Sequence, residues 1–266
     1  MQKLKKENKS LSSYLLNKKK NQEKLLVAFL PANYPDRETS LQLINYLLKH
    51  GVDALELGFP ALDASKDGKT IVEANRVVIG NGFKAADYFS LAKRVNQNQE
   101  YNRIAAMGYW DSLKADFAAK YQKKLKKAGI KDLIFPDLKA EKDIKLLNSS
   151  GYNLVPFLDS KEKIRGHTFK GEAFLYCPTH RGKTGTDKSF ELEFLEGLKN
   201  ELESSQLAEI PHLAGFGISS AEDVKKIMTL DFDGVIVGSE FINKIDQGMA
   251  AVEDFLAELK IALNKR

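Results

Sequence analysis

The chain has 266 residues, 43% of them hydrophobic, which is enough to form one domain with a sizeable core. Its formal net charge of +5 arises at one end, because residues 1–24 hold eight lysines and two glutamates while the rest of the chain carries about −1. This distribution argues against a nucleic-acid-binding surface, and no apolar run reaches the roughly 18 residues that a membrane span needs. The single cysteine, Cys177, excludes an intramolecular disulfide and a cysteine-based metal site.

The N-terminal segment, residues 1–24, is rich in Lys and interrupted by Asn and Ser, so it lacks the apolar core of a secretion signal. We therefore expect a cytoplasmic protein. The segment itself is either an extra helix that closes the floor of the domain or a loose tail.

From residue 25 onward, short β-branched or aliphatic runs alternate with longer stretches of helical period, the pattern of repeated βα units. The helical stretches include residues 39–51, 86–97, 115–129, 220–230 and 250–263. The predicted strands are residues 25–30, 54–57, 103–107, 132–135, 153–157, 173–177, 212–216 and 234–237.

Strands that are apolar on both faces and separated by helices predict a parallel sheet covered on both sides. Eight such units favour closure into a (β/α)8 TIM barrel, so we predict one α/β barrel domain over residues 1–266. An open doubly wound sheet is the alternative architecture. No G-x-G-x-x-G motif follows the first strand, which argues against a nicotinamide cofactor.

The second predicted strand contains one acidic residue, Glu56, within the otherwise apolar run ALELGFP. Burial there would raise its pKa toward the range useful for proton transfer, and the alternative is a structural carboxylate paired with a cation. Asp63 and Asp67 follow in the next loop and could reach the same pocket, although Asp before Gly is also ordinary turn chemistry.

Glycine and hydroxyl residues gather after the last three strands, in HRGKTGT (180–186), GFGISS (215–220) and VGSEF (237–241). Glycines let backbone N–H groups approach an anion, and a short helix beginning near Ser239 would direct its positive end to the same place. These late loops are the usual phosphate position of such barrels. The residues therefore predict an enzyme that acts on a phosphorylated metabolite by carboxylate acid–base catalysis.

The series LELGFP, DGKTI, GKTGT, GFGIS and DGVIVGS, in this order, resembles the tryptophan synthase α subunit family from about residue 25 to about residue 245. The Glu of LELG followed eleven residues later by the Asp of DG is the most specific part. The resemblance implies that Glu56 and Asp67 are catalytic. It implies that the substrate-binding residues are Phe29, Tyr109, Ile134, Tyr176, Thr184, Gly185, Phe216, Gly217, Gly238 and Ser239.

The family's reaction splits indole-3-glycerol phosphate into indole and glyceraldehyde 3-phosphate, in tryptophan biosynthesis. Glu56 would protonate indole C3 and take the proton of the adjacent hydroxyl, while Asp67 would stabilise the charge that develops on the ring nitrogen. The resemblance also implies a β-subunit partner in an α2β2 assembly, with pyridoxal phosphate in that partner and no cofactor in this chain.

The sequence departs from the family in the loop after the second strand, where the family pattern resembles PFSDPLADGPT and this chain has PALDASKDGKT. Two prolines are replaced, by Ala64 and Lys69, so loop closure should cost more conformational entropy. Lys66 or Lys69 could also pair with Asp67 and hold it away from indole.

Two alternatives remain open at the level of the sequence. One keeps the barrel but assigns another lyase or isomerase reaction on a phosphorylated metabolite, for which Lys139 or Lys183 would be the candidate Schiff-base lysine. The other is a catalytically weak subunit that acts mainly by binding and regulating a partner.

Overall fold

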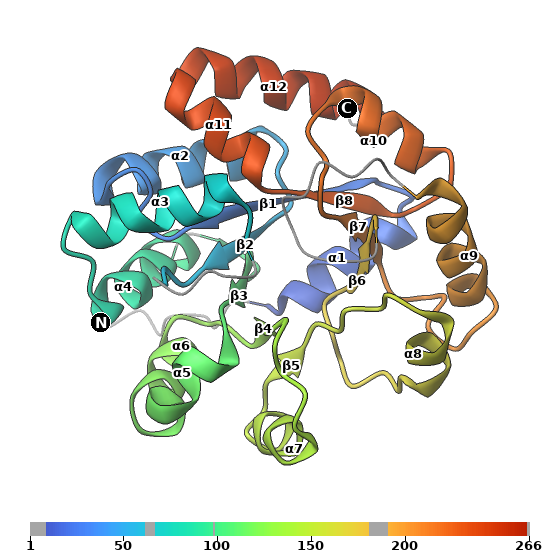
Figure 1. Cartoon of the computed structure of the whole chain (residues 1–266), viewed down its shortest axis with the longest axis horizontal. Helices are drawn as coiled ribbons and strands as arrows, with labels where there is room; N and C mark the ends of the chain where they lie inside the picture. Colours follow the sequence, from blue (N-terminus) through green and yellow to red (C-terminus); the bar gives the residue numbers. More distant parts are fainter. Residues whose placement is uncertain (1–8, 62–66, 98, 181–190, 265–266) are drawn as a thin grey trace, which may run out of the picture.

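The computed structural model describes residues 9–61, 67–97, 99–180 and 191–264. Eight parallel strands form one sheet in the order β5-β4-β3-β2-β1-β8-β7-β6, with helices on its outer side (Figure 1). The strands are β1 (Leu25–Pro31), β2 (Ala54–Gly58), β3 (Ile104–Met107), β4 (Asp132–Ile134), β5 (Asn153–Leu154), β6 (Leu175–Pro178), β7 (His212–Gly215) and β8 (Gly234–Val237).

The ring closes between the two ends of this order, where Phe157 forms an isolated parallel bridge with Tyr176. The Leu158 N–H donates to the Tyr176 carbonyl over 2.9 Å, and the Tyr176 N–H donates to the Pro156 carbonyl over 3.1 Å. The predicted (β/α)8 barrel is therefore confirmed. The predicted length of the fifth strand is wrong, because regular pairing stops at Leu154 and Pro156 has no N–H to contribute to a ladder.

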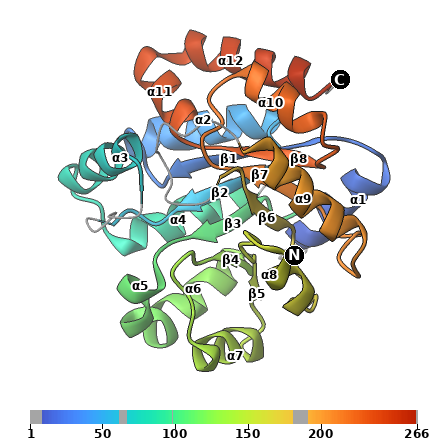
Figure 2. The ribbon, with the colours of Figure 1, turned by 45° about the vertical axis from the view of Figure 1, so that its right-hand side comes forward.

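Helices cover the outside of the barrel, and the turned view of Figure 2 shows the strands running inside this layer. None of the helices in the described ranges has the length and apolar character of a membrane span. The helices are α1 (Leu11–Lys20), α2 (Arg37–His50), α3 (Lys69–Gly80), α4 (Ala85–Asn96), α5 (Trp110–Asp116), a π-helical turn (Phe117–Tyr121), α6 (Gln122–Lys127), α7 (Glu141–Ser149), α8 (Lys161–Gly166), α9 (Leu192–Glu203), α10 (Ala221–Met228), α11 (Ser239–Gln247) and α12 (Met249–Ala262).

The helical segment after β3 begins earlier than its apolar period predicts, at Trp110 instead of near residue 115. The carboxylate of Asp137, from the loop after β4, accepts the N–H groups of Trp110 at 2.7 Å and Asp111 at 3.0 Å. These two donors belong to the first turn of α5 and would otherwise lack partners. A side chain distant in sequence therefore sets the start of this helix.

The N-terminal segment contains a helix, α1, which closes the floor of the barrel. Leu11 and Leu15 are fully buried and belong to the same cluster as the inward-facing Leu25 and Val27 of β1. Beside them, the Lys19 ammonium binds the carboxylate of Asp233 at 2.9 Å and two backbone carbonyls. Of the two predictions for residues 1–24, an extra helix or a loose tail, the helix is confirmed in the part that the structure describes.

Candidate functional site

Glu56 lies in the middle of β2, with its side chain inside the barrel. Strand residues alternate between faces, and Ala54 belongs to the inner cluster while Leu55 and Leu57 belong to the outer one. Glu56 is only 4% exposed and pairs in register with Phe29 of β1. Within the described residues no cation forms a salt bridge with it. The observed surroundings therefore do not support a structural ion pair for Glu56.

Burial, together with a smaller contribution from the nearby charge of Asp67, raises the pKa of Glu56 to about 8. Removal from water disfavours the charged carboxylate, and a second carboxylate adds repulsion. At neutral pH Glu56 is therefore largely protonated. A buried carboxylic acid with a pKa near neutrality can both give and take a proton.

Asp67 stands two residues before α3, at the edge of the barrel mouth. The Tyr109 hydroxyl, from the end of β3, donates to Asp67 Oδ1 over 2.5 Å. Burial raises the pKa of Asp67, and this hydrogen bond opposes the rise. Lys69 makes no ion pair with Asp67 in the described part of the chain, and Lys66 lies outside the described residues. The partner of Asp67 is thus a tyrosine.

Three aromatic rings line the interior near the ends of β5, β6 and β7. Tyr176 stacks on Phe157 with ring centroids 4.5 Å apart, and its ring lies 5.1 Å from that of Phe216. A methyl group on Gly215 would come within 2.5 Å of the Tyr176 hydroxyl, so glycine is required for this ring to lie flat over β7. Burial raises the pKa of Tyr176 well above its usual value, and the charge of Glu56 adds to this, which places the aromatic wall close to the acid.

The remaining predicted pocket residues separate into two groups. Ile134 is fully buried in the inner cluster with Tyr176, and the partly buried Phe216 packs on that cluster. Phe29 belongs to another cluster, formed with α3 and α11. Met107 packs against both clusters and connects them. Sequence reasoning missed Phe157, although its position at the end of a predicted strand was a usable signal.

The predicted phosphate-binding residues lie at the ends of β7 and β8. Phe216 and Gly217 both adopt the left-handed backbone region, with φ of 79° and 65°, which turns the chain sharply after β7. Helix α11 begins at Ser239, and its N-cap residue is Gly238, which has no side chain to cap the first turn. Its first N–H groups therefore remain available to an anion. Thr184 and Gly185 lie outside the described residues.

His180 borders this region and has two unsatisfied ring nitrogens. The side chain is 1% exposed, yet neither Nδ1 nor Nε2 has a hydrogen-bond partner among the residues that the structure describes. A methyl group placed on Gly217 would lie 3.8 Å from His180 Nε2, so this edge of the imidazole faces the turn after β7. Leaving a buried ring nitrogen without a hydrogen bond costs about 1–3 kcal/mol, so a polar group of a ligand bound beside it would gain a partner there.

Comparison with known proteins gives the family. The family model described as tryptophan synthase alpha chain matches residues 15–265. The chain belongs to the tryptophan synthase alpha chain family. A tryptophan synthase alpha chain from Thermoanaerobacter sp. (strain X514) is 32% identical over 251 residues, covering 90% of this chain and 94% of the relative.

Solved structures agree with this family at the level of the fold. The tryptophan synthase subunit alpha from Legionella pneumophila str. Paris has a TM-score of 0.81 at 22% identity, covering 96% of this chain and 98% of that one. A structure from Aquifex aeolicus VF5 has a TM-score of 0.80 at 26% identity, covering 96% of this chain and 99% of that one. The chain is therefore a lyase of tryptophan biosynthesis that cleaves indole-3-glycerol phosphate, and the alternative of another reaction on the same barrel is set aside.

Proposed function

We propose that Glu56 is the acid–base catalyst of this cleavage and that Asp67 stabilises the charge that develops on the indole ring. The observation that carries the proposal is a carboxyl group inside the barrel with a pKa near 8, no paired cation in the described residues and a second carboxylate close to it. An acid protonated at neutral pH suits the first step, which requires a proton on indole C3.

The two steps use the same carboxyl group in turn. Glu56 first donates its proton to C3, which leaves the ring nitrogen cationic, and Asp67 accepts the ring N–H and stabilises this charge. The carboxylate of Glu56 then removes the proton of the glycerol hydroxyl next to the bond. The electrons of the O–H bond form the aldehyde carbonyl, and those of the breaking carbon–carbon bond restore neutral indole.

Tyr109 holds Asp67 in place for this role. Its hydroxyl donates to one oxygen, Oδ1, so the other carboxylate oxygen can accept the indole N–H. Apolar and aromatic residues would contact the indole ring, which has a large apolar surface. We assign these contacts to Phe29, Tyr109, Ile134 and Tyr176.

The substrate phosphate would bind at the ends of β7 and β8. Gly217, Gly238 and Ser239 offer backbone N–H groups there, and the family resemblance adds Gly185 and Phe216 to the phosphate-binding positions. Thr184 matches instead the threonine that contacts the catalytic aspartate when the loop closes. We add His180 to this site, because its unpaired Nε2 faces the turn at Gly217. A hydrogen bond to a phosphate oxygen would satisfy a nitrogen that is otherwise buried without a partner.

We infer that the chain works with a tryptophan synthase β subunit, in an α2β2 assembly whose pyridoxal phosphate belongs to the β subunit. Solved structures of tryptophan synthase, including one from M. tuberculosis, share the fold of this chain. The chain itself is proposed to carry no cofactor and to act in the cytoplasm.

Indole release from indole-3-glycerol phosphate tests the catalytic assignment, with the purified chain alone and with a β subunit. Glu56→Gln should abolish release in both assays. Asp132→Asn is the matched control, because Asp132 is also a buried acid but lies at the N-terminal end of β4. Unchanged release by Glu56→Gln would refute its role. No release by the unaltered chain, even with its partner, would favour a regulatory subunit.

A further inference from the structure

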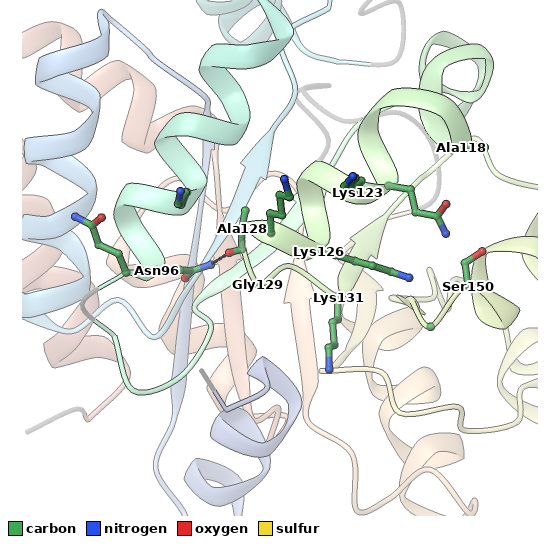
Figure 3. A pocket seen from close by; sticks show the side chains of 13 residues that line it. Asn96, Ala118, Lys123, Lys126, Ala128, Gly129, Lys131 and Ser150 are labelled. Atoms are coloured by element: carbon green, nitrogen blue, oxygen red, sulfur yellow. Dashed lines mark hydrogen bonds between the residues drawn. The ribbon is translucent and has the colours of Figure 1, made fainter. Parts of the chain in front are cut away.

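A basic cavity lies on the outside of the barrel, away from the catalytic mouth. It has a volume of about 880 Å³ and is formed where α4, α6 and α7 end, near the starts of β4 and β5. Figure 3 shows Lys123, Lys126 and Lys131 around the turn at Ala128 and Gly129. Asp67 lies beyond the C-terminal end of β2 and Glu56 lies inside the barrel in the middle of β2, so the cavity is separate from the proposed active site.

Five lysines from three segments line this cavity. Lys93 comes from α4, Lys131 precedes β4, and the other three, Lys123, Lys126 and Lys127, come from α6. No carboxylate is among the described residues that line it. The lining therefore concentrates positive charge without an internal counter-charge.

These lysines differ from those on other exposed helices. Lys120, Lys145 and Lys225 each form a salt bridge of 2.7–2.8 Å with an acid three or four residues away on the same helical segment. Within the described residues, none of the five cavity lysines forms a salt bridge. Their sequence positions provide no acid at that spacing, so the cluster lacks carboxylate partners on its own helices, and Lys126 Nζ lies 5.8 Å from the centre of the Tyr152 ring.

Helix dipoles account for only part of this charge. The carboxyl ends of three helices meet at the cavity, and each carries roughly half a negative charge, about 1.5 in total. Five ammonium groups exceed this by more than three charges. Stabilising the helix ends would therefore need fewer lysines than are present.

The floor of the cavity is rigid and uncharged. The Asn96 side-chain amide donates to Asn102 Oδ1 at 2.7 Å and to the Ala128 carbonyl at 2.9 Å, and its oxygen accepts the Arg103 N–H. Asn96 thus ties α4 to the turn after α6. Ser150, at the end of α7, adds a hydroxyl group to the lining.

We propose that this cavity binds a small molecule that carries three or more negative charges, of the polyphosphate class. The volume lies within the range of small-molecule sites, about 300–1,000 Å³. Lysine binds phosphate as a point charge, and several lysines on flexible stems adapt to a chain of linked phosphates. A single phosphate group would leave most of the lysines uncompensated.

Titration calorimetry of the full chain with inorganic triphosphate, at low ionic strength, tests this proposal. We expect saturable binding of one triphosphate that weakens steeply with added salt. The variant Lys93→Gln, Lys123→Gln, Lys126→Gln should weaken binding at least ten-fold. Its matched control, Lys49→Gln, Lys142→Gln, Lys226→Gln, removes the same charge from exposed positions elsewhere and should weaken it less than three-fold.

Three results would overturn the proposal. Equal weakening in both triple variants would show a general response to net charge. Unchanged binding in the cavity variant would place the triphosphate elsewhere, including the proposed catalytic phosphate site. Absence of saturable binding would show that the cavity is only a solvated basic surface. None of these results depends on indole release, so the test is independent of the proposed catalytic roles.

Discussion

Burial inside the barrel gives single carboxyl groups protonation states that differ from those in water. Glu56 keeps its proton near neutral pH because burial raises its pKa to about 8. Asp67 is less enclosed and accepts a hydrogen bond from Tyr109, so the ionised form is better supported there. Two carboxyl groups close together thus have different environments, which suits one for proton transfer and the other for charge stabilisation.

Replacing Glu56 by Gln should stabilise the chain at high pH while removing its activity. The folded pKa of Glu56 lies above its usual value, so its contribution to stability is present at low pH and is lost as pH rises through about 8. The melting temperature of Glu56→Gln relative to the parent should therefore increase between pH 5 and pH 9. Thermal denaturation at several pH values measures this difference, and a constant difference would contradict the raised pKa.

In the parent chain, kcat/KM for indole-3-glycerol phosphate should fall above about pH 8, as the free enzyme loses the proton of Glu56. A pH profile of initial rates measures this limb. A profile that stays flat to pH 9.5 would show that another group supplies the proton.

His180→Phe should separate stability from ligand binding. The phenyl ring fills a similar volume and removes two buried nitrogens that have no partner, so the melting temperature should stay the same or rise. Binding of glycerol 3-phosphate should weaken about ten-fold or more, because the proposed hydrogen bond to phosphate is lost. For the variant and the parent, scanning calorimetry measures the melting temperature and titration calorimetry measures the affinity for glycerol 3-phosphate.

His180→Asn keeps a donor and should lose less affinity than His180→Phe. His50→Phe is the control, since His50 stacks on Tyr46 on the outer side of α2 and should leave binding unchanged. Full affinity in His180→Phe would mean that the imidazole only fills space.

Secondary-structure elements follow the sequence pattern where their own residues determine them. The eighth predicted strand, residues 234–237, coincides with β8, because its bounds depend on a local apolar run between turn residues. The start of α5 could not be predicted, because the carboxylate of Asp137 determines it from a different loop. The stacking of Phe157 on Tyr176 also could not be predicted from the sequence, because the two rings meet only when the barrel closes.

The candidate site also contains features that the local sequence predicts and features that only the fold or a ligand reveals. Glu56 was found from the sequence because one acid in an apolar strand is conspicuous, and the structure confirms only its burial and its environment. The roles of the substrate-binding residues remain proposals, because they depend on a ligand. The unpaired nitrogens of His180 could not be inferred from a single loop histidine.

The helix at the barrel floor should contribute to global stability through Leu15. This side chain is fully buried in the inner cluster, so Leu15→Ala should lower the free energy of unfolding by about 2–5 kcal/mol. Leu16→Ala is the control from the same helix, because Leu16 is only partly buried and should cost less. Urea denaturation measures both. Equal losses in the two variants would contradict a specific role for α1 as the floor.

Across the whole molecule, acidic residues are buried toward both ends of the barrel. Near the floor, Asp132 is fully buried, and its Oδ2 has no hydrogen-bond partner within the described ranges. Its other oxygen accepts a 3.1 Å hydrogen bond from Asn153. Burial raises the pKa of Asp132 to about 7, although Asn153 and Lys131 oppose the rise. The ionisation of Asp132 therefore makes the free energy of unfolding depend on pH, although this residue is remote from the proposed chemistry.

Asp132→Asn should make the chain more stable at pH 8 and nearly unchanged at pH 3.5. The folded pKa of Asp132 is above its unfolded value, so the stability linked to its proton is complete below about pH 4 and is lost as pH rises through about 7. Asn keeps the oxygen that accepts from Asn153 and cannot ionise, so the gain at pH 8 should be on the order of a few kcal/mol. Urea denaturation at both pH values measures the gain, with the exposed Asp254→Asn as control. A variant less stable than the parent at pH 8 would show that ionised Asp132 is stabilised by its surroundings. Activity should be retained throughout, because this acid lies at the floor and Glu56 alone is proposed to move the proton.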